Sequence, residues 1–330
     1  MQVPIEEIRK ALEAALRKRG VDETMIPMLA DDYLEGELQG KQSHGLMAFP
    51  AFLEGAKDMA GKQAKIIKET HALVVMDADT LPGSYVGRML ADKLIQIAEK
   101  EGVAVGYILN MKIWLRPGII AQYVAEKNMV SFVINDGGQS MTAPPGGYDP
   151  VVGTNPIGIG IPTAPEPIIV DMATSKRAWG EARKAKRLGK ELPKDTFYTK
   201  IGEYAVRPDD AYSVEAMGGY KGFALALFIE MMTGSFLGRT LQAGEAPSNQ
   251  DYQCRMRGAM IVVFNPALTT DVEKMKKENS EFVAYIKGGQ KLSGVEEILI
   301  PGERAAKNRA KNIEKGTLEV DDELWSSITQ

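Results

Sequence analysis

Two basic side chains in glycine-containing turns are the residues of this sequence best suited to chemistry. His44 follows Ser43 in a Ser-His-Gly run, in a predicted turn after a helix, where an imidazole can take up or release a proton near neutral pH. Lys221 follows two glycines at the start of an apolar helix, where it can pair with a phosphate or a carboxylate. Each also has an ordinary interpretation: a structural turn histidine, and a solvated lysine at a helix start.

Two polar segments lie at predicted strand ends in the middle of the chain. Thr154 and Asn155 belong to a Gly-Thr-Asn-Pro turn, and a short strand leads into Asp171, Thr174 and Ser175. Hydroxyls and backbone amides at strand ends are where α/β proteins bind ligands. Turn formation and helix capping are the ordinary roles of the same residues.

The composition is that of an ordinary globular protein and excludes several kinds of site. The 330 residues are 44% hydrophobic and 25% charged, and a net charge of -4 without a block of like charge argues against a nucleic-acid partner. Cys254 is the only cysteine, which excludes intramolecular disulfides and thiolate clusters and fits a reducing compartment. Because His44 and His71 are the only histidines, we expect no metal site.

No stretch of the sequence suits a membrane or a signal peptide. Apolar runs fall short of the roughly 18–20 residues that cross a bilayer. The first residues form an amphipathic helix with charges throughout, unlike a signal peptide. We therefore expect a cytoplasmic protein that acts on a small molecule.

Helical and strand patterns alternate along the chain. Ile5, Ile8, Leu12 and Leu16 recur at helical spacing. Further helices are expected over 23–38, 86–101, 117–127 and 219–236, and strands over 73–76, 103–109, 130–134, 168–170, 259–264 and 298–300. This alternation predicts an α/β fold. We expect a helical N-terminal part (1–68), an α/β domain (69–270) and a C-terminal helical part (271–330) that packs with the N-terminal part.

The common nucleotide-binding and nucleophile motifs are absent. No Gly-x-Gly-x-x-Gly follows a strand, so the usual Rossmann fingerprint is missing. There is also no phosphate loop of the Gly-x-x-x-x-Gly-Lys-Ser/Thr type and no Gly-x-Ser-x-Gly elbow. A nucleotide would have to bind in another way.

The ordered set of motifs resembles a known family. Ser-His-Gly at 43–45, Gly-Thr-Asn-Pro at 153–156, Asp-Met-Ala-Thr-Ser at 171–175 with Ala-Trp-Gly at 178–180, Gly-Gly-Tyr-Lys-Gly at 218–222 and Ser-Asn-Gln at 248–250 occur in that order. Over roughly residues 5–325, their order and spacing are similar to those of the malate/L-lactate dehydrogenase family. These NAD(P)-dependent 2-hydroxyacid oxidoreductases include ureidoglycolate and sulfolactate dehydrogenases.

The resemblance implies a fold, an assembly and a reaction. The fold would be distinct from Rossmann, with a helical domain and a mixed-sheet cofactor domain (69–270), in an intimate homodimer. The reaction would be hydride transfer between NAD or NADP and a small 2-oxo acid, with His44 facing the substrate. The residues expected around the cofactor are Thr154, Asn155, Asp171, Thr174, Ser175 and Lys221, with Gly302 and Glu303 in a further turn on the cofactor side.

Two positions that the family uses for chemistry are replaced here. Its carboxylate-binding Arg, three residues after the Ser-His-Gly glycine, is Ala48, and the His of its Asn-Ser-x-His-x-Gly motif is Ile113. Loss of an acid/base group costs about 10²–10⁴-fold in rate, so native turnover is expected to be weak or absent. The residues expected at the substrate pocket are Ser43, Ala48, Met111, Ile113, Trp114 and Leu115.

These replacements leave several interpretations open. Substitutions concentrated at one site suggest a redesigned pocket, and a natural paralogue that lost its activity is the competing account. Lys112, among apolar neighbours, would have a lowered pKa and could form a Schiff base in retro-aldol chemistry. Alternatively, Lys112 points to water while its neighbours fill space. A third possibility is a non-catalytic binder, with Trp114 stacking on a hydrophobic ligand.

Overall fold

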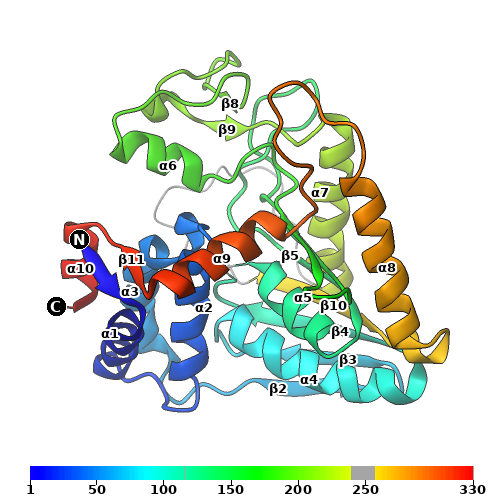
Figure 1. Ribbon diagram of the computed structural model, residues 1–330. Coiled ribbons are helices and arrows are strands. Elements are labelled where there is room, and N and C mark those ends of the chain that lie inside the picture. The colour runs from blue at the N-terminus through cyan, green and yellow to red at the C-terminus, as the bar shows by residue number, and fades with distance from the viewer. Residues whose placement is uncertain (115, 239–256, 330) are drawn as a thin grey trace.

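The computed structural model describes residues 1–114, 116–238 and 257–329 (Figure 1). Leu115, the Ser-Asn-Gln motif at 248–250 and Cys254 lie outside the described residues. A seven-stranded sheet with the order β2-β3-β4-β10-β5-β6-β7 crosses the molecule. Its strands are β2 (Lys65–Glu69), β3 (Leu73–Asp77), β4 (Val103–Met111), β5 (Val130–Asn135), β6 (Ile157–Ile161), β7 (Ile168–Met172) and β10 (Arg257–Phe264).

The sheet is mixed. Strands β3 and β4 run parallel, with Leu73 opposite Val105. The other neighbouring pairs are antiparallel. A parallel pair needs a crossover connection, and α4 (Gly83–Glu101) supplies it between β3 and β4. The expected α/β fold with a mixed sheet is confirmed.

Alternating side chains divide the core between the two faces of the sheet. On β4, Ile108 packs in the main hydrophobic cluster with α4 and α5 (Pro117–Glu126), which cover one face. Its neighbour Tyr107 packs on the other face, in a cluster that includes Ile229 of α7 (Tyr220–Thr233). The same alternation recurs at Met260 on β10, and it fixes the register of the central strands.

A helical layer made from both ends of the chain lies beside the sheet (Figure 1). Helices α1 (Ile5–Lys18), α2 (Ile26–Leu38) and α3 (Phe49–Ala56) pack with α9 (Glu303–Lys315) and α10 (Asp322–Thr329). Strand β1 (Gln2–Pro4) pairs antiparallel with β11 (Thr317–Glu319). The helical periodicity of the first residues is confirmed, because Ile8, Leu12 and Leu16 are buried.

Two further groups of elements lie away from this layer. Helix α6 (Gly180–Arg187), with β8 (Phe197–Tyr198) and β9 (Ser213–Val214), has its own small apolar cluster (Figure 1). Helix α8 (Val272–Lys287) lies against the β6–β7 turn, where Asn279 donates to the carbonyl of Pro162 at 3.0 Å. The domain boundaries at 68 and 270 stay a prediction. In the described ranges, no helix is long and apolar enough to cross a membrane.

Several expected elements differ from the structure. Residues 298–300 form no strand, because the backbone N–H of Ile300 is bound by the Glu303 carboxylate at 3.0 Å instead of by a neighbouring strand. The helix expected to 236 ends at Thr233, before Gly234 and the short 3-10 helix η5 (Ser235–Leu237). Helix α2 begins at Ile26 rather than at residue 23.

Candidate functional site

A cluster of charged groups joins the helical layer to the sheet edge. Lys41, just after α2, forms an ion pair with Asp171 of β7. The other carboxylate oxygen of Asp171 accepts the backbone N–H of Gly118 at 3.3 Å, at the start of α5. Arg116, which caps α5, places Nη1 3.8 Å from Asp171. We call Lys41, His44, Arg116 and Asp171 the polar cluster.

Arg116 is the buried end of the polar cluster. Its side chain is only 3% exposed, compared with 10% for Asp171 and 29% for Lys41. Nη1 donates to Gln39 at 2.6 Å, and the backbone carbonyl of Arg116 accepts the indole N–H of Trp114 at 2.9 Å. Among the described residues, Nε and Nη2 have no hydrogen-bond partner. A buried guanidinium with unpaired N–H groups is costly and calls for an explanation.

His44 is the imidazole of the polar cluster. It closes the short 3-10 helix η1 (Gln42–His44), and its Nδ1 lies 3.0 Å from the hydroxyl of Ser43. Burial lowers the pKa of His44 to about 4, although the nearby charge of Asp171 acts in the opposite direction. His44 is therefore uncharged at neutral pH. A neutral imidazole can accept a proton from a bound alcohol.

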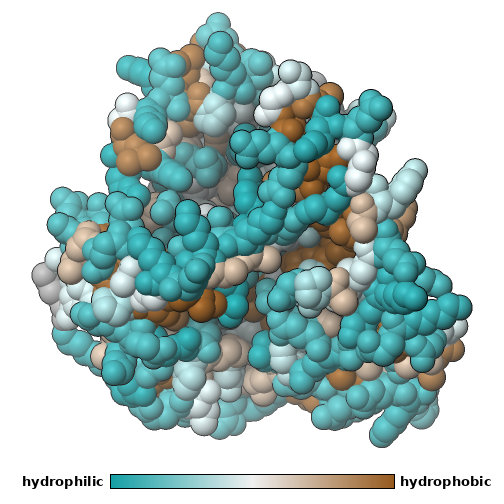
Figure 2. Space-filling model, in the orientation of Figure 1, coloured by the Kyte–Doolittle hydropathy of each residue, from teal (hydrophilic) through white to brown (hydrophobic). Residues whose placement is uncertain are grey.

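Helix α2 holds the turn that carries His44. The Glu37 carboxylate accepts the N–H of Leu46 at 3.1 Å, and a Cβ on Gly45 would lie 2.5 Å from that carboxylate. Burial raises the pKa of Glu37. On the far side, a Cβ on Gly180 of α6 would lie 2.7 Å from the Cβ of Ser43. The turn is therefore fixed between α2 and α6, and the surface is hollowed between α6 and α9 (Figure 2).

The polar segments at 154–155 and 174–175 do meet in space. The Thr174 hydroxyl donates to the carbonyls of Thr154 at 3.0 Å and Asn155 at 3.1 Å. The Asn155 side chain is buried and donates to the carbonyl of Ala226 at 2.8 Å and to Glu230 at 2.9 Å, both on α7. Asn155 adopts a positive φ of 33°, which asparagine tolerates better than most residues.

The same junction reaches the start of α7. The N–H of Met217 donates to the Thr174 carbonyl at 2.9 Å. The Ser175 hydroxyl donates to the carbonyl of Arg177 at 2.8 Å. Gly219 caps α7 with a φ of 64°, and Lys221 is exposed in the first turn. A helix N-terminus with glycines and a lysine attracts phosphate.

The structure fits a phosphate-bearing cofactor at this junction. A Cβ on Gly137 would lie 2.6 Å from the amide nitrogen of Thr154 and 2.7 Å from that of Asn155. Gly137 is thus packed directly against these two backbone amides, which leaves no room for a side chain. A Cβ on Gly218 or Gly219 would meet no atom of the described residues within 4 Å. Of the residues expected around the cofactor, those that lie at this junction are Thr154, Asn155, Thr174, Ser175 and Lys221, of which Asn155 and Thr174 are fully buried.

The turn at Gly302 and Glu303 packs against β7, and its expected place beside the cofactor stays a prediction. Gly302 has a φ of 89°, and a Cβ there would lie 3.0 Å from the carbonyl oxygen of Ile169 on β7. The Glu303 carboxylate forms ion pairs with Lys287 and Lys307. The hydrogen bond from Lys287 is the main reason that the pKa of Glu303 falls to about 2. Glu303 is therefore an ionised group in the first turn of α9.

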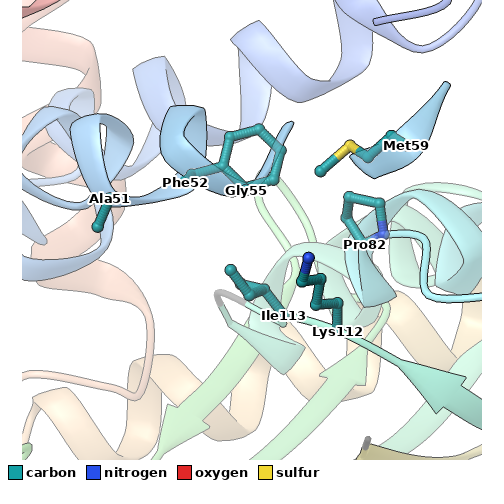
Figure 3. A pocket seen from close by; sticks show the side chains of 7 residues that line it. All are labelled: Ala51, Phe52, Gly55, Met59, Pro82, Lys112 and Ile113. Carbon is teal, nitrogen blue, oxygen red and sulfur yellow. The ribbon is translucent and has the colours of Figure 1, made fainter. Parts of the chain in front are cut away.

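Lys112 lies outside the polar cluster. Its Nζ donates to Asp58 at 2.8 Å in an ion pair, so this nitrogen already has a partner outside the polar cluster. Lys112 and Ile113 point from the end of β4 toward Phe52 and Gly55 of α3, across a pocket that they line (Figure 3). The cavity volume is about 10 Å³, near the minimum for one water molecule. A carbonyl substrate does not fit there.

The other residues expected at the substrate pocket fill space. Met111 is fully buried and Trp114 is 6% exposed, and both belong to the main hydrophobic cluster. They face α4, because a Cβ on Gly83 would lie 2.6 Å from the sulfur of Met111 and 2.7 Å from the Trp114 ring. Ala48 packs against the same cluster at the start of α3.

The sequence-based reasoning missed two residues of the polar cluster. Lys41 is three residues before His44, and Arg116 directly precedes the proline that begins α5. Neither belongs to a motif, and each acquires its partner only through the fold. The one sequence signal that could have indicated them is that Lys41 and Arg116 lie close in the sequence to the replaced positions 48 and 113.

Comparison with known proteins identifies the family. The family model described as malate/L-lactate dehydrogenase matches residues 3–329. The chain belongs to this family. A malate/(S)-sulfolactate dehydrogenase from Methanothermus fervidus is 29% identical over 335 residues, covering 100% of this chain and 97% of that protein. An L-sulfolactate dehydrogenase from Methanothermobacter thermautotrophicus is 28% identical, covering 99% of this chain and 95% of that protein.

Solved structures agree with this assignment. The sulfolactate dehydrogenase from Methanocaldococcus jannaschii superposes with a TM-score of 0.88 at 28% identity, over 99% of this chain and 95% of that chain. A malate dehydrogenase from Entamoeba histolytica has a TM-score of 0.92 at 22% identity, over 99% of this chain and 96% of that chain, and shares the fold. The fold of this malate/L-lactate dehydrogenase family member positions the polar cluster beside the junction of Thr154, Asn155 and Thr174.

Proposed function

We propose that this chain is an NAD(P)-dependent oxidoreductase that interconverts small 2-hydroxy and 2-oxo acids slowly. The observation that carries the proposal is the junction of Thr154, Asn155 and Thr174 with the start of α7. It places Lys221 and the uncrowded glycines before α7, Gly218 and Gly219, near the carboxyl end of β7, which also bears Asp171 of the polar cluster. Membership of the malate/L-lactate dehydrogenase family supports the same reaction class.

The cofactor would be held at this junction and would supply or accept the hydride. Lys221 and the amides at the start of α7 would bind its phosphates. Asn155, fixed by Ala226 and Glu230, would keep the amides facing Gly137 in place.

Proton transfer falls to the polar cluster, because Ile113 has no titratable group. His44 is uncharged at neutral pH, so it would accept the hydroxyl proton during oxidation of a 2-hydroxy acid. Burial lowers the pKa of Lys41, whereas its ion pair with Asp171 favours the protonated form. Because reduction follows the same path in reverse, the protonated His44 would return this proton to the substrate oxygen, and the Lys41 ammonium would stabilise the negative charge that develops there.

The test is NADH and NADPH oxidation with a panel of small 2-oxo acids. We expect slow turnover, and a rate about 10²–10⁴-fold higher after Ile113→His combined with Ala48→Arg. Lys221→Ala is expected to weaken cofactor binding, measured by calorimetry, whereas Lys186→Ala, on an exposed surface pair with Asp209, leaves it unchanged. The proposal would be contradicted if neither the unmodified chain nor the Ile113→His, Ala48→Arg variant bound NADH or NADPH.

We also propose that the protein forms a homodimer through α7. This helix exposes apolar side chains that a monomer would leave in water. The exposed residues are Tyr220, Leu225, Leu227, Phe228 and Met231, followed by Phe236. Sedimentation is expected to give twice the mass of one chain, and Phe228→Glu to give the monomer. Ile201→Glu, also at an exposed apolar position, is the control and leaves the dimer intact. A monomeric unmodified protein would refute the proposal.

A further inference from the structure

We propose that the Nε–Nη2 edge of Arg116 binds the carboxylate of a small 2-oxo acid. Arg116 would thus take the place of the carboxylate-binding arginine that the family has at position 48, where this chain has Ala48. The inference rests on the proposed function, since it names how that function's substrate is held. It starts from the two guanidinium nitrogens that lack a partner among the described residues.

The free nitrogens lie on one edge of a fixed guanidinium. Nη1 is held by Gln39 at 2.6 Å and lies 3.8 Å from Asp171. Nε and Nη2 are the pair that a carboxylate binds with two parallel N–H···O bonds. The bond from the Trp114 indole to the Arg116 carbonyl, at 2.9 Å, fixes the backbone behind the side chain. The edge is therefore oriented before any ligand arrives.

The charges around the edge select a single small anion. The single negative charge of Asp171 is shared between Lys41, its ion-pair partner, and Arg116. Asp171 therefore does not fully neutralise the positive charge of Arg116. Asp32 of α2 also acts on Arg116 through its charge, and no ion pair joins the two in the described structure. Burial raises the pKa of Asp32 to about 6, so Asp32 is still mostly ionised at pH 7 and opposes the binding of a further anion at Arg116. The two oxygens of one carboxylate match the two donors that remain, Nε and Nη2 of Arg116.

The position of Arg116 limits the size of the ligand. Exposure falls from 29% at Lys41 to 10% at Asp171 and 3% at Arg116, so the polar cluster runs inward from the surface. Met111 and Trp114 fill the space beside it. A carboxylate at Arg116 would leave the adjacent 2-oxo carbon near Lys41 and near His44, the group proposed to transfer the proton. This geometry suits acids of two or three carbons.

The experiment measures binding of oxamate, a stable analogue of a small 2-oxo acid, without cofactor, by calorimetry and tryptophan fluorescence. Arg116→Lys keeps the positive charge but removes the bidentate pair of N–H donors, so we expect the affinity for oxamate to fall about 10–100-fold. Asp32→Asn removes an opposing charge and is expected to tighten binding. Neutral acetamide is the matched control ligand and is expected to bind neither variant nor the unmodified chain. Thermal unfolding of each variant verifies that it is folded.

Two outcomes would overturn the inference. One is oxamate affinity unchanged in a folded Arg116→Lys protein. The other is an Asp32→Asn protein that loses stability without any gain in affinity, which would make Arg116 the structural partner of Asp32. Oxamate binding that depends on Arg116 without NAD(P)H oxidation would instead refute only the proposed function. Oxidation with an unchanged KM in Arg116→Lys would refute only this inference.

Discussion

Lys41 and Asp171 are 130 residues apart in the sequence and form an ion pair between the helical layer and the edge strand of the sheet. Asp171 also faces Arg116, so one carboxylate compensates two cations. The pair therefore links the part of the chain that carries His44 to the part that would hold the cofactor.

Asp171→Asn is expected to destabilise the protein by about 3–5 kcal/mol, because it leaves the buried Arg116 without its nearest opposite charge. Urea unfolding at pH 7 measures the change in the free energy of unfolding. Asp209→Asn is the control, since the exposed Lys186–Asp209 pair is expected to contribute less than about 1 kcal/mol. Equal effects of the two substitutions would contradict the structural importance of Asp171.

His44 predicts a loss of stability on acidification. Its pKa is about 4 in the folded protein, below the ordinary 6.5, so the unfolded chain binds more protons between these values. Stability from this group is full above pH 6.5 and is lost as the pH falls toward 4, by on the order of 1–3 kcal/mol. We expect His44→Gln to flatten this slope, measured by urea unfolding at several pH values. Asp32, whose raised pKa gives the opposite slope, is present in both proteins. A pH-independent difference between the two proteins would show that His44 does not titrate in this way.

The packing of Met111 and Trp114 on α4 predicts opposite effects for two Gly→Ala substitutions. At Gly83 the new methyl would lie 2.6 Å from Met111 and 2.7 Å from Trp114, so we expect a loss of about 1–3 kcal/mol. At Gly55, within α3, the nearest atom would be 3.6 Å away, and alanine is expected to stabilise the helix by about 0.5–1 kcal/mol. Thermal unfolding compares the two, and a stable Gly83→Ala protein would argue against this packing.

Lys112→Met tests the alternative carbonyl chemistry. Because Lys112 is paired with Asp58 beside a pocket of about 10 Å³, borohydride with a small aldehyde is expected to give no adduct specific to this residue. Peptide mass spectrometry of the unmodified and Lys112→Met proteins is the measurement. A stoichiometric adduct that only the unmodified protein forms would revive the Schiff-base interpretation.

The parts of the fold that local patterns determine were predictable. Ile8, Leu12 and Leu16 gave the periodicity of α1, and the β-branched runs gave β4 and β5. Strand β6 was missed because its glycines resemble a turn. Gly160 is needed there because a Cβ would collide with the carbonyl of Ala121 on α5, a contact that exists only in the folded protein.

The candidate site, too, has parts that local motifs indicate and parts that depend on contacts made only in the folded protein. His44 and the junction at Thr154 and Thr174 could be named from motifs, and the structure brings Thr154 and Thr174 into contact. Lys41 and Arg116 could not, because their partners lie far away along the chain. The reverse holds at 298–300, where an apolar run favours a strand but Glu303 binds the Ile300 amide instead.

The pairing of β1 with β11 sets an order of events during synthesis. Val3 of β1 lies opposite Leu318 of β11, so β1 cannot pair until a strand more than 300 residues later in the sequence has been synthesised. Until then α1 and α2 lack α9 and α10, the helices that pack against them. On the ribosome, the β-sheet can assemble while the helical layer stays open, and the ion pair between Lys41 and Asp171 must form across that open layer. The polar cluster is therefore expected to be among the last parts of the molecule to reach its final arrangement.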